Sequence, residues 1–357
     1  MKLHLAMLAA TAACAAFAAD FKDEDYDWYT GDDLPLEGKA FKDTDGYFTR
    51  IPASYKEKVT PQVLGMSYHS TGMTLRFVAQ SDKVAIKWKT KNTWEWTADH
   101  YMCICVHSEM DYYLREPGSD KWSYRQQLAV DKDGVGRQLM QWLRPGTVVL
   151  VHLPVRGVVE SLELGVPKGG AKYTAAPAHT LAAKPIVHYG TSIVHGGCVT
   201  RPGLVFTSQA ARQADVEVVN LGFSGAGRME MAMAEMLAEA DASCYVLDCL
   251  WNMDMKMTEE RYEPFIRALR KARPDVPIVM CEKCSTDDWD SDGSKFVRSL
   301  YARLVAEGWR NLTLLPAKEM MPLDPDLTLD HIHPNDAGSR YMGVAYARAY
   351  ERALGKK

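Results

Sequence analysis

Hydrophobic and polar residues alternate over short stretches in the first half of the chain. Runs rich in β-branched and aromatic residues are separated by polar turns such as Asp131-Lys132-Asp133-Gly134, and the clearest runs are residues 73–78, 83–89, 101–106 and 147–152. An alternation with a period of two residues, bounded by turn residues, is typical of β-strands. Because few helical stretches interrupt these runs between about residues 28 and 167, the pattern predicts an antiparallel β-sandwich or jelly roll.

A second pattern begins after residue 184, where apolar runs of strand length alternate with helical stretches. Predicted strands cover residues 185–190, 216–221, 244–250, 276–281 and 312–315, and predicted helices cover 202–214, 228–240, 258–273 and 294–307. We expect Thr258 to open the third helix and Pro264 to kink it or mark a second start. Asn335 or Asp336 is expected to cap a last helix that runs to about residue 354. Strands that alternate with helices predict a parallel sheet with helices on both faces.

The two patterns divide the chain into a leader, two domains and a linker. Residues 1–19 combine a basic start, an apolar stretch too short for a bilayer and an A-x-A site at residues 16–18, which is typical of a secretory signal peptide. The β-sandwich is expected over residues 20–170, the linker over 171–184 and the α/β domain over 185–357. We therefore expect an exported protein, periplasmic or secreted, without a membrane span. A lipid anchor at Cys14 is the alternative.

Charge and cysteine content exclude several classes of protein. The chain has 42 Lys and Arg residues against 46 Asp and Glu residues, and the formal net charge of -4 offers no basic surface for nucleic acid. Eight cysteines less Cys14 leave seven, which do not indicate a dense disulfide framework in a chain of this length. Cys281 and Cys284 have C-x-x-C spacing, but no second Cys or His pair follows with zinc spacing. We expect a local disulfide or two buried thiols there.

Polar residues cluster where the predicted parallel strands end, and reactive groups collect at these ends in such folds. Ser192 lies in the first cluster, residues 188–197. A serine between glycines after a buried strand can expose its hydroxyl and point its own N–H into the same space. The alternative interpretation is an ordinary turn. The second cluster, residues 220–227, has three glycines whose N–H groups can approach a ligand at the start of a helix. A dinucleotide loop, with Asp248 as the ribose-binding acid, competes with this interpretation, but its glycine order would be reversed.

Two further clusters supply an amide and an imidazole. Asn252 follows the third predicted strand and can point its amide N–H into the same space, or it can be a turn residue. Asp330 precedes His333 by three residues, so its carboxylate can hold the imidazole Nδ1–H and leave Nε2 as a base. A metal site built from Asp330, His331, His333 and Asp336 is the competing interpretation. We favour the acid–base interpretation.

Taken together, the four clusters resemble the SGNH hydrolases, also called the GDSL esterase superfamily. Gly190-Thr191-Ser192-Ile193 stands in place of the Gly-Asp-Ser-Leu block, and Gly225 matches the glycine of the second block. Asn252 matches the asparagine of the third block, and Asp330-x-x-His333 matches the last block. The departures are Thr191 in place of Asp and Leu250-Trp251 in place of a glycine-containing lead-in.

The resemblance implies a flavodoxin-like fold for the C-terminal half and a serine hydrolase mechanism without a metal or another cofactor. In that mechanism Ser192 is the nucleophile, His333 the general base and Asp330 the group that orients the imidazole. The oxyanion hole then consists of the N–H groups of Ser192 and Gly225 and the side-chain amide of Asn252.

The N-terminal half resembles the β-domain that precedes this type of SGNH domain in secreted esterases. The likeness lies in residues 31–41 and in residues 110–114. In the second segment Asp111 and Tyr113 remain from a Gly-x-Asp-Leu-Tyr motif, whereas Glu109 and Tyr112 replace its Gly and Leu. The layout is similar to that of carbohydrate esterases that pair a jelly roll with an SGNH domain, which implies O-deacylation of a sugar.

Aromatic and basic side chains can contribute to substrate binding. Trp94, Trp96 and Trp122 can stack on sugar rings or pack in the sandwich core, and Arg201 and Arg228 can contact an acidic sugar or pair with carboxylates. The expected function is removal of O-acetyl groups from an acylated carbohydrate, such as a polysaccharide or a glycoprotein glycan. A lipid or thioester acyl hydrolase and a catalytically idle glycan-binding protein are the alternatives.

Overall fold

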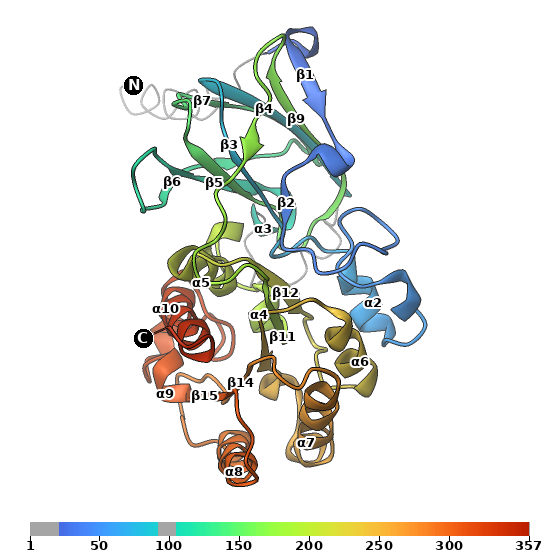
Figure 1. The fold of residues 1–357 in the computed structure, drawn as a ribbon, viewed down its shortest axis with the longest axis vertical. Coiled ribbons are helices and arrows are strands. Elements are labelled where there is room, and N and C mark those ends of the chain that lie inside the picture. The colour runs from blue at the N-terminus through green and yellow to red at the C-terminus, as the bar shows by residue number, and fades with distance from the viewer. Residues whose placement is uncertain (1–20, 92–104, 357) are drawn as a thin grey trace, which may run out of the picture.

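A computed structural model describes residues 21–91 and 105–356 of the chain. Within these residues the strands form three sheets, two antiparallel ones in the N-terminal half and a parallel one in the C-terminal half (Figure 1). This arrangement confirms the predicted fold class, an α/β domain preceded by an antiparallel β-sandwich. The predicted leader and Cys14 lie outside the described residues. No helix in the described part has both the length and the apolar composition needed to cross a bilayer.

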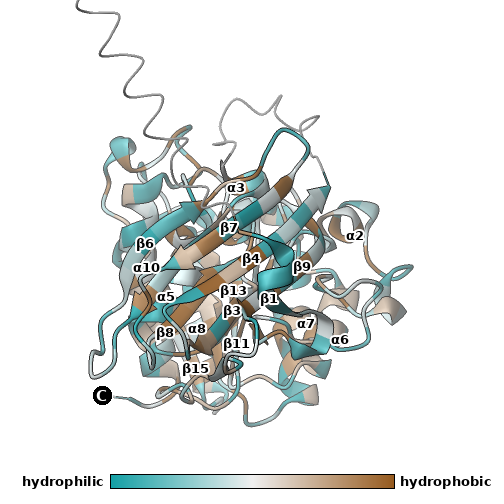
Figure 2. Ribbon diagram, turned by 90° about the horizontal axis from the view of Figure 1, so that it is seen from above, coloured by the Kyte–Doolittle hydropathy of each residue, from teal (hydrophilic) through white to brown (hydrophobic). Residues whose placement is uncertain are grey.

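The N-terminal sandwich has one sheet of order β1-β9-β4-β7 and one of order β10-β3-β8-β5-β6, in which β2 pairs with β3. The strands are β1 (Tyr26–Tyr29), β2 (Leu36–Glu37), β3 (Thr74–Val78), β4 (Lys83–Lys91), β5 (Met110–Arg115), β6 (Ser123–Leu128), β7 (Val135–Gln141), β8 (Val148–His152), β9 (Val158–Pro167) and β10 (Thr174–Ala175). Bands of hydrophobic and hydrophilic residues follow one another along β4 (Figure 2). Side chains from both sheets, including Phe77 and Trp88, form one buried core.

One predicted strand in this half is wrong. Residues 101–104 of a predicted strand lie outside the described part, but Cys105–Ser108 form the short helix α3. The predicted linker is also more ordered than its Gly and Pro content indicated, because Thr174 and Ala175 pair with β3. The linker therefore adds an edge strand to the sandwich before the chain enters the α/β domain.

The parallel sheet has the order β12-β11-β13-β14-β15, which is the flavodoxin-like order 2-1-3-4-5. Its strands are β11 (Ile186–Gly190), β12 (Val218–Gly222), β13 (Cys244–Asp248), β14 (Ile278–Cys281) and β15 (Leu312–Leu315). One face packs on α6 (Met231–Glu239), α7 (Met255–Ala272) and α8 (Asp292–Ala306), and the other packs on α5 (Phe206–Ala214), α9 (Ala317–Met320) and α10 (Asp336–Ala353). Ligands bind such sheets beside the carboxyl ends of the strands where the strand order reverses.

Several helix starts differ from the prediction. Helix α7 begins at Met255 rather than Thr258, because the Asp254 side chain caps it by accepting a hydrogen bond from the N–H of Met257 at 2.7 Å. It also continues through Pro264, so no second start exists there. Helix α6 begins at Met231, three residues after the predicted start. Asn335 caps α10 as predicted.

Part of the N-terminal half packs directly on the α/β domain. Helix α2 (Pro61–Ser67) lies beside α6 (Figure 1), and its Val63 and Met66 belong to the same buried cluster as the β12 side chains. The buried guanidinium of Arg50 donates to the carbonyls of Asn220 at 3.1 Å and Gly222 at 2.8 Å, at the end of β12. This contact holds the N-terminal half against the edge of the sheet at which the polar strand-end clusters lie.

Candidate active site

Ser192 is the first residue of the short helix α4 (Ser192–His195), which follows β11 directly (Figure 1). Gly190 makes this sharp change of direction possible, because a Cβ there would lie 2.4 Å from both the Asp248 carbonyl oxygen and a methyl group of Val194. The first N–H groups of a helix have no partner within the helix. The N–H of Ser192 can therefore serve a ligand that reaches the start of α4.

Three side chains form a continuous hydrogen-bonded line at this position. The Oγ of Ser192 lies 2.7 Å from Nε2 of His333, and Nδ1 of His333 lies 2.7 Å from Oδ2 of Asp330. A neutral imidazole that donates Nδ1–H to the carboxylate has Nε2 free to accept the Ser192 hydroxyl proton. The predicted nucleophile, base and orienting acid thus come together in the arrangement that serine hydrolases use.

The backbone around Asp330 holds its carboxylate toward the ring. Oδ1 of Asp330 accepts the N–H groups of Ile332 at 3.1 Å and of His333 at 2.7 Å, across a turn in which His331 has a φ of 64°. Burial raises the pKa of Asp330, but these N–H groups and the His333 ring outweigh it and lower the pKa below the ordinary value. The carboxylate is therefore ionised at neutral pH and can stabilise a protonated His333.

Gly225 and Asn252 line the same cavity as Ser192 and His333. Gly225 has a φ of 66° in the turn after β12, a conformation that glycine adopts at low cost. Within residues 21–91 and 105–356, its N–H donates to no other group. Asn252 ends a 3₁₀ turn after β13, and its Nδ2 donates to the carbonyl of Ala226, which leaves its second N–H for a ligand.

The cavity has a volume of about 420 Å³ and is open to solvent. Besides the predicted residues, it is lined by Gln62, Met66 and Arg156 of the N-terminal half. Sequence reasoning missed these three residues because no motif or spacing links them to the strand-end clusters. The N-terminal half is therefore part of the wall of the candidate active site.

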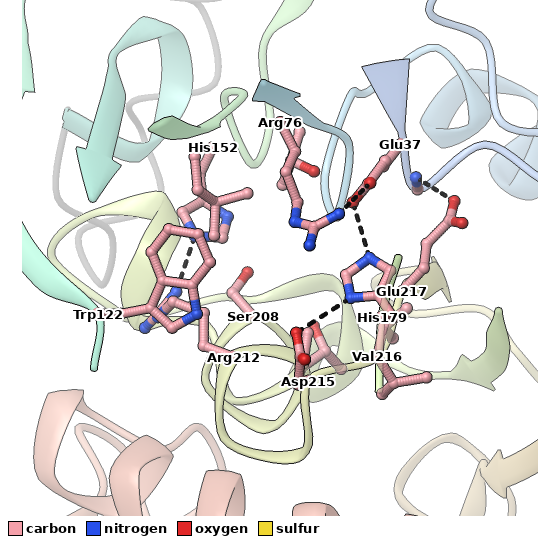
Figure 3. Close-up of a pocket in the computed structure, with 17 residues that line it drawn as sticks. Glu37, Arg76, Trp122, His152, His179, Ser208, Arg212, Asp215, Val216 and Glu217 are labelled. Atoms are coloured by element: carbon pink, nitrogen blue, oxygen red, sulfur yellow. Dashed lines mark hydrogen bonds and ion pairs between the residues drawn. The ribbon is translucent and has the colours of Figure 1, made fainter. Parts of the chain in front are cut away.

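A second cavity lies between the sandwich and α5 (Figure 3), and Ser192 is not among the described residues that line it. Its wall carries a charged network in which His179 lies 3.1 Å from Glu37 and 3.4 Å from Asp215. The space within it measures about 40 Å³, which suits a few water molecules rather than a sugar. Trp122 lines this cavity, and the guanidinium of Arg115 lies over its ring. Trp122 is part neither of the sandwich core nor of the wall of the Ser192 cavity. Trp94 and Trp96 lie outside the described residues.

The residues of the competing metal site do not converge. The exposed ring of His331 lies 3.6 Å from Asp287, and Asp336 accepts two hydrogen bonds from Thr200, at 2.8 and 2.7 Å. Within the described ranges, no group of three or more His, Cys, Asp or Glu side chains is arranged to hold a metal ion. The four residues of the metal interpretation therefore do not form one ligand cluster in the described part of the chain.

Other candidate residues have structural partners instead. Asp248 is fully buried and accepts a hydrogen bond from Tyr346 at 2.6 Å, so it cannot act as a ribose-binding acid. Arg201 binds the Asp111 carboxylate at 2.6 Å, and the backbone N–H of Arg228 donates to Glu230 at 3.1 Å. Neither arginine is among the described residues that line the Ser192 cavity.

Cys281 and Cys284 are buried free thiols, which confirms one of the two alternatives and excludes the local disulfide. Burial raises the pKa of the Cys281 thiol well above its ordinary value. Both side chains belong to the hydrophobic cluster between the parallel sheet and α10. They therefore act as small apolar residues of the core.

Solved structures share this two-part fold. A GDSL-like lipase from Bacteroides ovatus superposes with a TM-score of 0.79 at 25% identity, covering 93% of this chain and 99% of that one. A salicylyl-acyltransferase from a tetracycline biosynthetic pathway superposes with a TM-score of 0.74 at 17% identity, covering 94% and 99%. A family two carbohydrate esterase from Cellvibrio japonicus superposes with a TM-score of 0.59 at 11% identity, covering 93% and 98%. Among curated proteins, none matches the chain.

Two family models match successive parts of the sequence. The model of the GDSL-like lipase/acylhydrolase family matches residues 183–355, which include all four strand-end clusters. The model of the N-terminal domain of SGNH-hydrolase-type esterases, named for the Gly-x-Asp-Leu-Tyr motif, matches residues 26–171. Residues 183–355 therefore form a domain of the GDSL-like lipase/acylhydrolase type, and this domain follows the N-terminal domain of SGNH-hydrolase-type esterases.

Proposed function

We propose that this protein is an exported serine esterase that removes O-acetyl groups from carbohydrates. The observation that carries the proposal is the hydrogen-bonded line Ser192–His333–Asp330 beside the N–H donors of Gly225 and Asn252, in one open cavity. Acyl transfer to serine requires a serine hydroxyl, an imidazole held in the tautomer that can accept its proton, and N–H groups that converge on the carbonyl oxygen.

The reaction proceeds in two halves. Ser192 Oγ attacks the ester carbonyl carbon while His333 Nε2 takes the hydroxyl proton, and Asp330 stabilises the resulting imidazolium. The negatively charged carbonyl oxygen is held by the N–H groups of Ser192, Gly225 and Asn252. The bond to the sugar oxygen then breaks, and His333 returns the proton to that oxygen. Water attacks the acetyl-serine in the same way, which releases acetate and restores Ser192.

The carbohydrate part of the proposal is supported by the neighbours in fold and by the character of the cavity. Similar structures include family two carbohydrate esterases, one of them in complex with cellohexaose. The cavity is large for an acetyl group alone, and its wall includes polar side chains, Gln62 and Arg156, beside the indole ring of Trp251. Planar rings next to hydrogen-bonding groups suit a sugar with many hydroxyls.

Acetate release from a panel of acetylated oligosaccharides and polysaccharides tests the activity and its substrate class. The wild type is expected to release acetate, and Ser192→Ala is expected to release almost none. The matched control Ser299→Ala changes an exposed serine of α8 and should retain full activity. Full activity of Ser192→Ala would contradict the assignment of the nucleophile.

A series of nitrophenyl esters from acetyl to octanoyl separates the proposal from a lipid hydrolase. We expect the highest kcat/KM for acetyl and a decline with acyl length. A maximum at octanoyl would favour the lipid alternative. Covalent labelling of Ser192 by a phosphonate excludes an idle glycan-binding protein.

Export is tested by the N-terminus of the mature protein. We expect a mature chain that begins at Asp20, after the A-x-A site. Mass spectrometry of the extracellular or periplasmic protein measures this directly. A lipid-modified chain that begins at Cys14 would support the anchored alternative instead.

A further inference from the structure

The N-terminal half contacts the turn that carries Gly225 through two side chains. Nε2 of Gln62, on α2, donates to the carbonyl of Ser224 at 3.0 Å. Nη2 of Arg156, in the loop between β8 and β9, donates to the hydroxyl of the same residue at 2.8 Å. We infer that Gln62 and Arg156 are positioning residues that hold the Ser224–Gly225 turn so that the Gly225 N–H faces the reacting carbonyl. This inference rests on the proposed esterase function.

Gln62 lies directly against the predicted donor. A Cβ built on Gly225 would lie 2.4 Å from Nε2 of Gln62, closer than any real contact of this kind. The Gln62 side chain therefore packs on the Cα of Gly225 while it binds the preceding carbonyl. Displacement of the Gln62 amide would free both the carbonyl and the glycine that follows it.

Ser224 also connects this contact to the helix of the nucleophile. Its Oγ lies 3.3 Å from Nδ1 of His195, the last residue of the helix that begins with Ser192. Burial, with the nearby charges of Arg156 and Arg50, lowers the pKa of His195 well below its ordinary value, so the ring is neutral. Nδ1 can then accept the Ser224 hydroxyl proton while Nε2–H donates to the carbonyl of Val155 at 3.2 Å. Ser224 is thereby held from the N-terminal half and from α4 together.

Such a support matters because stabilisation of an oxyanion depends on donors that are fixed before the reaction. Gly225 lies in an irregular turn with a positive φ, where the backbone alone restricts the direction of the N–H weakly. Displacements of about 1 Å in a reacting geometry can cost about 100-fold in rate. The contacts of Ser224 explain why an N-terminal domain that contains none of the family blocks forms part of the cavity wall.

The test compares Gln62→Ala, Ser224→Ala and Arg156→Ala with Gln138→Ala and Arg144→Ala, two substitutions in the sandwich away from the cavity. We expect kcat to fall about tenfold in each of the first three variants and KM to change less than threefold, because a positioned donor acts on the transition state. The affinity for phenylboronic acid, which forms a tetrahedral adduct with serine, should fall by the same factor as kcat/KM. The two control variants should match the wild type.

A double-mutant cycle separates positioning from direct substrate contact. If Arg156 acts through the Ser224 hydroxyl, the variant carrying both Arg156→Ala and Ser224→Ala is no slower than either single variant. If Arg156 contacts the substrate instead, the two effects multiply and appear largely in KM, which would overturn the inference. Gln62 has an exposed side chain, so Gln62→Ala is expected to fold even if Arg156→Ala does not.

The outcomes also distinguish this inference from the proposed function. Esterase activity retained by Ser192→Ala would contradict the proposed function. An inactive Ser192→Ala together with wild-type kcat and boronate affinity in Gln62→Ala and Ser224→Ala would contradict only the positioning role.

Discussion

The buried carboxylate of Asp111, on β5 of the sandwich, binds Arg201 in the segment that follows α4. Arg201 Nη1 lies 2.6 Å from Oδ2 of Asp111, and the N–H of Gly203 donates to Oδ1 of the same carboxylate at 2.9 Å. Arg201 also donates to the hydroxyl of Tyr113 at 2.6 Å. The two residues that remain from the Gly-x-Asp-Leu-Tyr motif thus join the N-terminal half to the α/β domain.

Replacing Asp111 should therefore destabilise the whole protein. Asp111→Ala leaves the guanidinium and the Gly203 N–H without their acceptor, and removing one partner of a buried pair costs about 3–5 kcal/mol. Urea unfolding at pH 7.5 measures this loss of the free energy of unfolding. The exposed Asp133→Ala serves as the control, with an expected change within about 0.5 kcal/mol. A loss below about 1 kcal/mol for Asp111→Ala would show that the pair adds little.

Asp330→Asn tests the role of the carboxylate next to His333. The oxygen of the introduced amide can still accept the backbone N–H groups of the turn, but the amide NH₂ can donate a hydrogen bond to Nδ1 of His333. That hydrogen bond stabilises the imidazole tautomer with its proton on Nε2. In this tautomer Nε2 cannot accept the proton of the Ser192 hydroxyl. We expect kcat to fall by about 10⁴ with little change in KM. Steady-state kinetics on an acetyl ester measures the change, with the exposed Asp326→Asn as the control. Turnover within tenfold of the wild type would argue against this role.

Asn252→Ala tests the third oxyanion donor. Removal of one such donor typically costs about 10²–10³ in kcat, and the loss here should lie in that range. Asn252→Asp should be slower still, because a carboxylate cannot donate and repels the developing negative charge. Equal kcat values for the wild type and Asn252→Ala would exclude the side chain from the oxyanion hole.

The sequence predicted the parts of the site that are encoded locally. Asp330 and His333 are three residues apart in one turn, and Ser192 and Asn252 each follow a buried strand, so their spacing alone indicated where they lie. The hydrogen bond between Gln62 and Ser224 spans 162 positions, and the one between Arg156 and Ser224 spans 68. Such contacts depend on how the two domains pack, and this packing leaves no periodic pattern in the sequence.

Errors in the predicted elements have a similar origin. Asp254 and Thr258 are both good helix caps, and only the geometry after β13 decides that Asp254 is used. Residues 105–106 alternate like a strand, but they form part of α3, since tertiary packing overrides a short local pattern. The parallel strands β11 to β14 were predicted more closely because each is buried on both faces and reads as a nearly continuous apolar run.

Asp248→Asn should stabilise the protein in a pH-dependent way. Burial raises the pKa of Asp248 to about 6, and the hydrogen bond from Tyr346 opposes this only in part. The folded-state pKa exceeds the ordinary value of 3.8, so the folded protein binds the Asp248 proton more tightly than the unfolded chain does. The wild type therefore has its full free energy of unfolding below about pH 4, and it loses part of that free energy as the pH rises through 6. At pH 8 the amide variant, which has no charge to bury, should be more stable by up to about 3 kcal/mol.

Unfolding by urea at pH 8 and pH 4 measures the effect. The difference between Asp248→Asn and the wild type should nearly vanish at the lower pH. Asp241→Asn, whose side chain is exposed, should change stability little at either pH. A difference of the same size at both values would mean that the pKa of Asp248 is the same in the folded and the unfolded protein.

His188→Gln should weaken the acid sensitivity of the protein. The ring is buried on β11 with Nδ1 3.0 Å from the hydroxyl of Tyr350, and burial lowers its pKa to about 3. Because the folded-state pKa lies below the ordinary value of 6.5, unfolding takes up a proton, and the stability that is present above pH 6.5 is lost as the pH falls toward 3. One such proton corresponds to about 1.4 kcal/mol per pH unit. Glutamine can keep a hydrogen bond to Tyr350 without this proton uptake, so the free energy of unfolding should fall less steeply between pH 6 and about pH 4.

Urea unfolding across this range compares the slopes, and His331→Gln, at an exposed ring, should leave the wild-type slope unchanged. Parallel slopes for the wild type and His188→Gln would mean that His188 takes up no proton on unfolding.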